Sequence, residues 1–152
     1  MELTTTKKIL KEAQEGHYAI GAFNVENMEM VMAVISAAEE MNAPVIMQTT
    51  PSTVKYAGLD YFLANVRVAA SKANVPVVMH LDHGSSFELA SQAYRSGYTS
   101  IMIDGSHSDF ESNIEISKSV KLPQALRLSD AVVDQKSGHP APGHFCQGRQ
   151  RD

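Results

Sequence analysis

Residues 75–84 read VPVVMHLDHG, an apolar run that passes directly into two histidines and an aspartate. The run does not alternate between apolar and polar residues, which is typical of a parallel strand covered on both faces. Ionisable side chains then stand at positions 80, 82 and 83. This stretch therefore predicts a buried strand over Val75–His80 that carries chemical groups at its carboxyl end.

Similar apolar segments alternate with segments of helical spacing along most of the chain. The other predicted strands are Tyr18–Phe23, Ala43–Gln48 and Thr99–Ile103, and the predicted helices are Thr5–Glu15, Met28–Met41, Leu59–Ala73, Ser86–Ser96 and Phe110–Val120. Gly16 is expected to cap the first helix, and the eight methionines are expected to fill the core. The alternation predicts parallel strands joined by right-handed helical crossovers, which is an α/β fold.

Two α/β architectures fit this order, a doubly wound sheet and a (β/α)8 barrel. The turn FNVENMEM at residues 23–30 lacks the glycine fingerprint of dinucleotide-binding folds. We therefore favour the N-terminal part of a (β/α)8 TIM barrel, with about four β/α units.

Composition narrows the classes of function. The chain has 152 residues, a net charge of −4 and one cysteine. The negative charge argues against a general nucleic-acid surface, and no apolar run approaches the roughly 18–20 residues that cross a bilayer. The first residues contain no apolar signal stretch, and a lone cysteine fits a reducing compartment. We expect a cytoplasmic protein without disulfides.

Polar side chains follow every predicted strand. They are Asn24 after the first, Gln48 and Thr50 after the second, His80, Asp82 and His83 after the third, and Asp104 and Ser106 after the fourth. In a barrel the carboxyl ends of the strands surround the active site, so these groups are expected to converge. A neutral imidazole can bind zinc and a neighbouring carboxylate can move protons. The alternative is that these residues only cap loops.

Four stretches carry a resemblance to a known family. GAFNVENME (21–29), APVIMQTTP (43–51), VPVVMHLDHGSSFE (75–88) and SGYTSIMIDGSHSDFESNI (96–114) resemble the N-terminal half of class II, zinc-dependent ketose-bisphosphate aldolases. The tagatose-bisphosphate branch is the most similar, and the fructose-bisphosphate branch is next. The resemblance runs from about residue 4 to Val120 and implies a (β/α)8 barrel, usually a dimer or tetramer.

The resemblance implies an activity and a role for the central motif. Asp82 would donate and accept the proton at the substrate hydroxyl during carbon–carbon cleavage, and His83 would be one of three histidine ligands to Zn2+. His80 would support the site without binding zinc. The reaction implied splits tagatose or fructose 1,6-bisphosphate into dihydroxyacetone phosphate and glyceraldehyde 3-phosphate. Because residues i and i+2 of a strand face the same way, His80 and Asp82 are expected to align, while His83 turns elsewhere as the strand bends out.

The resemblance also implies roles for the other strand ends. Asn24 and Thr50 would lie near the substrate, with Thr50 at its phosphate. Asp104 and Ser106 would lie behind the metal ligands or near an auxiliary cation.

The last 32 residues differ from the rest of the chain. Residues 121–152 carry five Lys or Arg against three Asp or Glu, and three of the six prolines. They lack the glutamate-bearing fifth strand and the later zinc histidines of the family. His139, His144 and Cys146 have the spacing H-x4-H-x-C, but the prolines and glycines between them predict an irregular loop. We divide the chain into a partial barrel (1–120) and a divergent, irregular tail (121–152), typical of a frameshift or truncation.

Two functions from different classes remain open on this reasoning. The first is the N-terminal part of an aldolase, which is expected to be inactive alone because one histidine cannot hold catalytic zinc where three protein ligands are usual. The second is a non-catalytic barrel subunit that binds a companion aldolase subunit. The pair Asp82 and His83 favours catalytic ancestry. The sequence does not separate tagatose from fructose bisphosphate.

Overall fold

The computed structural model describes residues 2–121 and 133–135. The elements in chain order are α1 (Thr6–Gly16), β1 (Gly21–Asn24), α2 (Met28–Glu40), β2 (Val45–Thr49), α3 (Pro51–Ala57), α4 (Leu59–Lys72), β3 (Val77–Gly84), α5 (Phe87–Ser96), β4 (Ser100–Ile103), α6 (Phe110–Lys121) and β5 (Val133–Gln135). None of the helices in these residues has the length and apolar character needed to cross a membrane.

The strand order decides between the two architectures. The described strands form one parallel sheet in the order β1-β2-β3-β4-β5, so each strand pairs with its predecessor in the chain. A doubly wound sheet reverses direction at a switch point, for example in the order 3-2-1-4-5-6. The sequential order is that of a barrel, and within the described residues β1 pairs on one side only.

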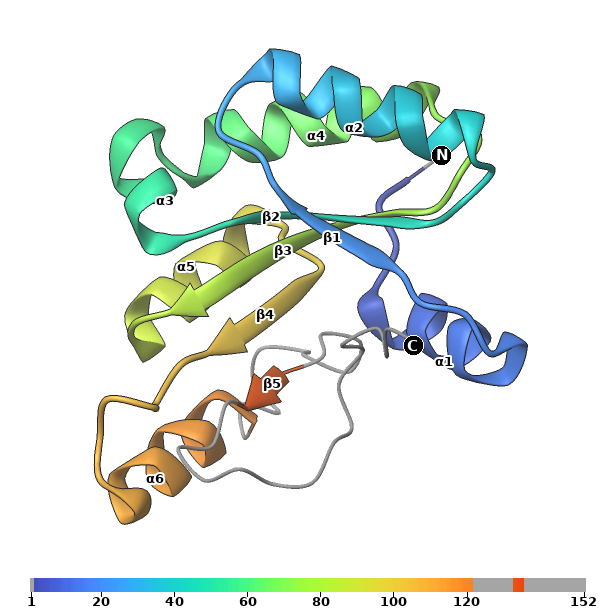
Figure 1. The fold of residues 1–152 in the computed structure, drawn as a ribbon. Coiled ribbons are helices and arrows are strands. Elements are labelled where there is room, and N and C mark those ends of the chain that lie inside the picture. Colours follow the sequence, from blue (N-terminus) through green and yellow to red (C-terminus); the bar gives the residue numbers. More distant parts are fainter. Residues whose placement is uncertain (1, 122–132, 136–152) are drawn as a thin grey trace, which may run out of the picture.

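Different helices lie on the two faces of the sheet (Figure 1). On one face, strand residues such as Met47 and Met79 pack with residues of α2, α4 and α5 in the main core. On the other face, Ile46 and Val78 pack against Ile9 of α1. Figure 1 shows α2 and α4 side by side on the first face and α1 near the end where the strands begin. The face that carries Ile46 and Val78 is the inward face, which points to the interior of a barrel. At the end where the strands begin, α1 covers this inward face.

The predicted elements are present, with three differences. The segment after Thr50 forms an additional helix, α3, because Thr50 caps it and Pro51 occupies its first turn. Gly16 is the last residue of α1, and His17 with φ 56° is the left-handed cap instead. The third strand continues through HLDHG to Gly84, so its ionisable residues lie within the strand.

The fifth strand, β5, falls in the segment 121–152 that the sequence predicts to be irregular. Its three residues pair in parallel with β4. His139, His144 and Cys146 lie outside the described residues.

The methionines are divided between core and surface. Met47, Met79 and Met102 are buried, whereas Met28, Met30, Met32 and Met41 are exposed. The expectation of a core role is wrong for the second group, because α2 turns Val31, Ile35 and Ala38 toward the sheet instead.

We predict that Met47→Ala lowers the free energy of unfolding by about 2–5 kcal/mol, because the side chain is completely buried. Met41→Ala is the matched control, since Met41 is 75% exposed, and it should change stability by no more than about 0.5 kcal/mol. Urea unfolding measures both, and equal losses would contradict the core described above.

Candidate active site

A β-bulge places the central pair of residues. His80 and Leu81 pair with Ser100 and Ile101, but Gly84 pairs with Ile103, so the register shifts between Leu81 and Gly84. Two residues, Asp82 and His83, therefore stand opposite one residue of β4, which is the pattern of a bulge. His83 has a φ of 52°, in the left-handed region.

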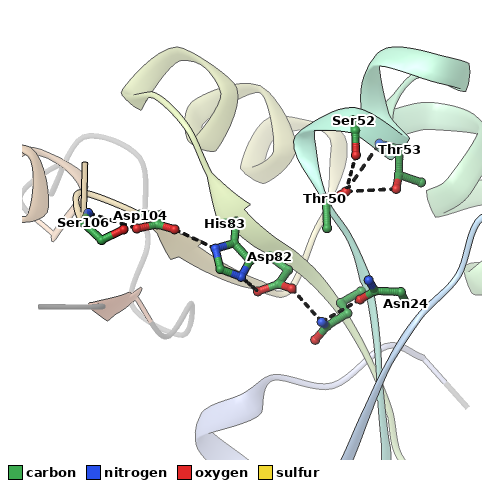
Figure 2. A network of polar contacts seen from close by, with 9 residues as sticks. Asn24, Thr50, Ser52, Thr53, Asp82, His83, Asp104 and Ser106 are labelled. Atoms are coloured by element: carbon green, nitrogen blue, oxygen red, sulfur yellow. Dashed lines mark hydrogen bonds and ion pairs between the residues drawn. The ribbon is translucent and has the colours of Figure 1, made fainter. Parts of the chain in front are cut away.

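The bulge changes the direction of His83. On a regular strand Asp82 and His83 would face opposite sides of the sheet. Here His83 Nε2 lies 3.8 Å from Asp82 Oδ1, and the two side chains converge (Figure 2). The expectation that His83 turns away from Asp82 is therefore wrong. The Asp82 side chain is 16% exposed and that of His83 is 44% exposed, so the pair is open to a ligand.

Gly84 permits the bulge to lie close to β4. A Cβ atom at Gly84 would come within 2.6 Å of the backbone oxygen of Met102. This oxygen cannot move aside without shifting β4. Glycine at this position is thus a steric requirement of the HLDHG motif.

A line of polar contacts connects four strand ends (Figure 2). Gln48 Nε2 donates to Asn24 Oδ1 and to Asp82 Oδ2, each at 2.7 Å. His83 Nδ1 contacts Asp104 Oδ2 at 2.6 Å, and the backbone N–H of Ser106 donates to Asp104 Oδ1. The structure thus brings together five of the seven residues predicted from the sequence.

Gln48 is the member of this line whose role the sequence analysis missed. An amide nitrogen carries two hydrogens, and the two contacts of Gln48 Nε2 use both. Gln48 is the register partner of Asn24, so its position at the end of β2 was the available signal. Its two bonds leave Asp82 Oδ1 and the Asn24 amide nitrogen for other partners.

Asp104 determines which nitrogen of His83 carries the hydrogen. Burial of Asp104 opposes its ionisation, but hydrogen bonds from Ser106 and His83 outweigh burial and hold its pKa well below the usual range. An ionised carboxylate only accepts hydrogen bonds, so His83 Nδ1 donates. Nε2 of the neutral ring is then unprotonated, which is the arrangement of metal-binding histidines oriented by a carboxylate.

His80 and Thr50 lie outside this line of contacts. His80 Nδ1 contacts Ser100 Oγ at 2.7 Å, and Ser100 accepts from Thr6 Oγ1 at 3.0 Å. Burial lowers the pKa of His80 to about 4, although nearby Asp82 opposes this shift. Thr50 belongs to a separate group of hydrogen bonds with Ser52 and Thr53 at the start of α3 (Figure 2).

A cavity of about 560 Å³ opens beside His83 and Asp104. Its lining includes His83, Asp104 and His107, together with residues at the start of α5 and Pro51. The carboxyl ends of β2, β3 and β4 therefore border one space.

The described residues do not form a complete zinc site. His83 offers Nε2, but residues 2–121 and 133–135 contain no group of three His, Cys, Asp or Glu side chains able to hold a metal ion. Catalytic zinc uses three protein ligands. His83 alone is consistent with a metal ligand.

Comparison with known proteins shows the family of the chain. A family model described as fructose-bisphosphate aldolase class-II matches residues 4–126. The chain belongs to this family. The match ends close to the boundary that the sequence predicts for the tail, and the division at residue 120 stays a prediction.

Individual members of the family are similar in sequence to most of this chain. The fructose-bisphosphate aldolase of Thermus caldophilus is 48% identical over 140 residues, covering 91% of this chain and 45% of that protein. The 6-phospho-5-dehydro-2-deoxy-D-gluconate aldolase of Halalkalibacterium halodurans is 42% identical over 123 residues, covering 79% of this chain and 43% of that protein. The chain thus spans less than half the length of these relatives.

A solved structure supports the fold. The crystal structure of the YdjI aldolase from Escherichia coli K12 matches with a TM-score of 0.73 and 41% identity, covering 78% of this chain and 46% of that one. The structural neighbours are aldolase barrels, so the predicted partial (β/α)8 barrel is confirmed.

We predict that Gly84→Ala destabilises the chain by about 1–3 kcal/mol, because the added Cβ meets the backbone of β4. Gly21→Ala on β1 is the control, since its Cβ would meet only the flexible and half-exposed ring of Phe23. Thermal or urea unfolding compares the two, and a larger loss for Gly21→Ala would contradict the described bulge.

We predict that the stability of the chain falls by about 3 kcal/mol between pH 7 and pH 4 because of His80. The unfolded histidine binds a proton near pH 6.5, whereas the pKa of the folded one is about 4. The unfolded state therefore binds more protons in this window, and acid favours unfolding. Asp104, whose pKa is depressed, contributes a loss only below about pH 4.

His80→Gln provides the comparison for this pH dependence. Urea unfolding at several pH values should show a shallower decline for His80→Gln than for the unchanged chain between pH 6.5 and pH 4. Identical slopes would show that His80 is not buried as a neutral ring.

Proposed function

We propose that this chain supplies the N-terminal half of a class II aldolase active site, which cleaves a ketose 1,6-bisphosphate. The products would be dihydroxyacetone phosphate and glyceraldehyde 3-phosphate. The observation that carries the proposal is the convergence of Asp82 and His83, 3.8 Å apart, in a chain that matches the family over residues 4–126.

Asp82 is assigned the proton transfer. Gln48 occupies Oδ2, so Oδ1 is the oxygen that takes the proton of the substrate hydroxyl. As this proton leaves, the hydroxyl oxygen becomes the aldehyde carbonyl and the carbon–carbon bond breaks. The electron pair of that bond passes to the ketone half, which a proton converts to dihydroxyacetone phosphate. Such positioned acid–base groups contribute about 10²–10⁴-fold to rate.

His83 is assigned one position in a zinc site that other residues complete. A bound zinc ion supplies Lewis-acid polarisation of the substrate carbonyl. The contribution of this chain is to orient the imidazole, because Asp104 holds Nδ1 at 2.6 Å and directs Nε2 toward the space beside Asp82. The described residues contain one such ligand, so we assign no zinc-dependent step to the chain alone.

The remaining assignments follow the same proposal. Asn24 and Thr50 are placed on the substrate side, with Thr50 near a phosphate, and Ser106 supports Asp104 through its backbone N–H. The substrate is tagatose or fructose 1,6-bisphosphate, and the location is the cytoplasm. A further polypeptide segment, from a second copy or a companion aldolase subunit, would complete the barrel beside β1.

We predict zinc-dependent activity for a chimera that joins residues 1–126 to the C-terminal part of the Thermus caldophilus aldolase. It should cleave fructose or tagatose 1,6-bisphosphate, lose activity with a chelator, and lose about 10²–10⁴-fold in kcat on Asp82→Ala. His83→Ala should lower the zinc content. A coupled assay for dihydroxyacetone phosphate measures the rate.

Controls separate chemistry from folding in this experiment. Asp60→Ala changes an exposed carboxylate on α4, and His17→Asn changes an exposed histidine with a left-handed φ. Both should leave the rate and zinc content unchanged. The chain by itself should show no measurable cleavage. A folded chimera that binds zinc and is insensitive to Asp82→Ala would refute the proposed role.

A further inference from the structure

Side chains on the inward face of β3 form successive layers. Val78, His80 and Asp82 are two residues apart, and alternate residues of a strand share a face. Val78 packs against Ile9 of α1, and Asp82 contacts Gln48 near the open end. His80 therefore lies between the layer that α1 covers and the layer that carries the proposed acid–base group.

Two buried hydroxyl groups connect α1 to His80. Thr6 Oγ1 donates to Ser100 Oγ at 3.0 Å, and Ser100 Oγ lies 2.7 Å from His80 Nδ1. Thr6 is 4% exposed and Ser100 is 1% exposed, so these contacts are shielded from water. Thr6 comes from the N-terminal helix, Ser100 from β4 and His80 from β3, which makes this a link between three elements.

The direction of these hydrogen bonds fixes the state of the imidazole. A hydroxyl has a single hydrogen to donate. Ser100 Oγ has lone pairs enough to accept from both neighbours. Within the described residues, however, its side-chain contacts are with Thr6, which donates to it, and with His80, so the buried hydrogen of Ser100 has a partner only if it is directed to His80 Nδ1. The hydrogen of a neutral His80 ring is then on Nε2. Burial lowers the pKa of His80 to about 4, so the ring is neutral at pH 7.

His83 has the opposite arrangement three residues later. Its Nδ1 donates to the ionised Asp104, whereas Nδ1 of His80 faces a hydroxyl. The Nδ1 atoms of the two histidines of the HLDHG motif therefore meet different partners, a serine hydroxyl and a carboxylate.

We propose that Thr6 and Ser100 hold His80 as the Nε2–H tautomer directly beneath the layer of Asp82 and Gln48. All three residues are then positioning residues of the active site. The role assigned to this layer rests on the proposed function, whereas the tautomer does not. Through this link, α1 fixes a side chain next to the acid–base group although the helix lies at the other end of the strands. A charged or rotated His80 would alter both the charge and the packing under Asp82.

The test is a long-range ¹H–¹⁵N correlation spectrum of the ¹⁵N-labelled chain at pH 7, which distinguishes the two neutral tautomers of each histidine. The expected result is a single Nε2–H pattern for His80. Thr6→Val keeps the shape of the side chain and removes the hydroxyl, so the single pattern should be lost. Thr6→Ser restores a hydroxyl and should restore the pattern. Ser117→Ala removes a buried serine hydroxyl on α6 and should change nothing.

The side-chain amide signal of Gln48 in the same samples reports on the layer of Asp82 and Gln48. The side-chain amide of Gln48 donates to Asp82, so its ¹H and ¹⁵N shifts should move in Thr6→Val and return in Thr6→Ser. A purely local role of Thr6 in folding α1 would not produce this paired change and rescue.

Several results would overturn the proposal. One is a His80 in the unchanged chain that is charged, mixed or Nδ1–H. Another is a folded Thr6→Val chain with an unchanged His80 pattern. A change in the His80 pattern without a change in the Gln48 amide shifts would show that the link does not reach the layer of Asp82 and Gln48. No zinc or substrate is present in these samples, so failure of the aldolase proposal would appear only in the chimera.

Discussion

The β-bulge at Asp82 and His83 is the constraint on which the site depends. A regular parallel strand would send one of these side chains toward the helices and only the other toward the barrel interior. The extra residue, with its left-handed φ, turns both toward the same end of the sheet. The next residue must be glycine, Gly84, because a side chain there would meet the backbone of β4. Asp82 and His83, the residues we propose for proton transfer and for metal binding, therefore become neighbours in sequence and in space.

Hydrogen bonds to residues at the ends of the two strands beside β3 fix the orientation of this pair. Gln48 on β2 holds one oxygen of Asp82, Asp104 after β4 holds one nitrogen of His83, and each contact leaves the other atom of the side chain for a ligand. Parallel strands in sequential order make this possible, because they bring polar residues from successive β/α units to one edge. The chain thus carries an organised group of polar residues and covers less than half the length of the matched members of its family.

Much of the fold was predictable from the sequence, because continuous apolar runs and amphipathic segments are local signals. The pattern of polar strand ends also predicted that Asp82, His83 and Asp104 lie close together. The bulge was not predictable, since a two-residue period assumes a regular strand, and it reversed the expected direction of His83. The contacts of Thr6 and Ser100 depend on how α1 packs under the sheet. Local sequence contains no signal for such long-range packing.

The most direct measurement is a crystal structure of the chain. The expected result is a parallel β3 in which Asp82 and His83 converge at the carboxyl end, with one extra residue opposite β4 and His83 Nδ1 hydrogen-bonded to Asp104. A regular β3 that buries His83 among the helices would contradict the proposed active site, as would an antiparallel neighbour beside β3.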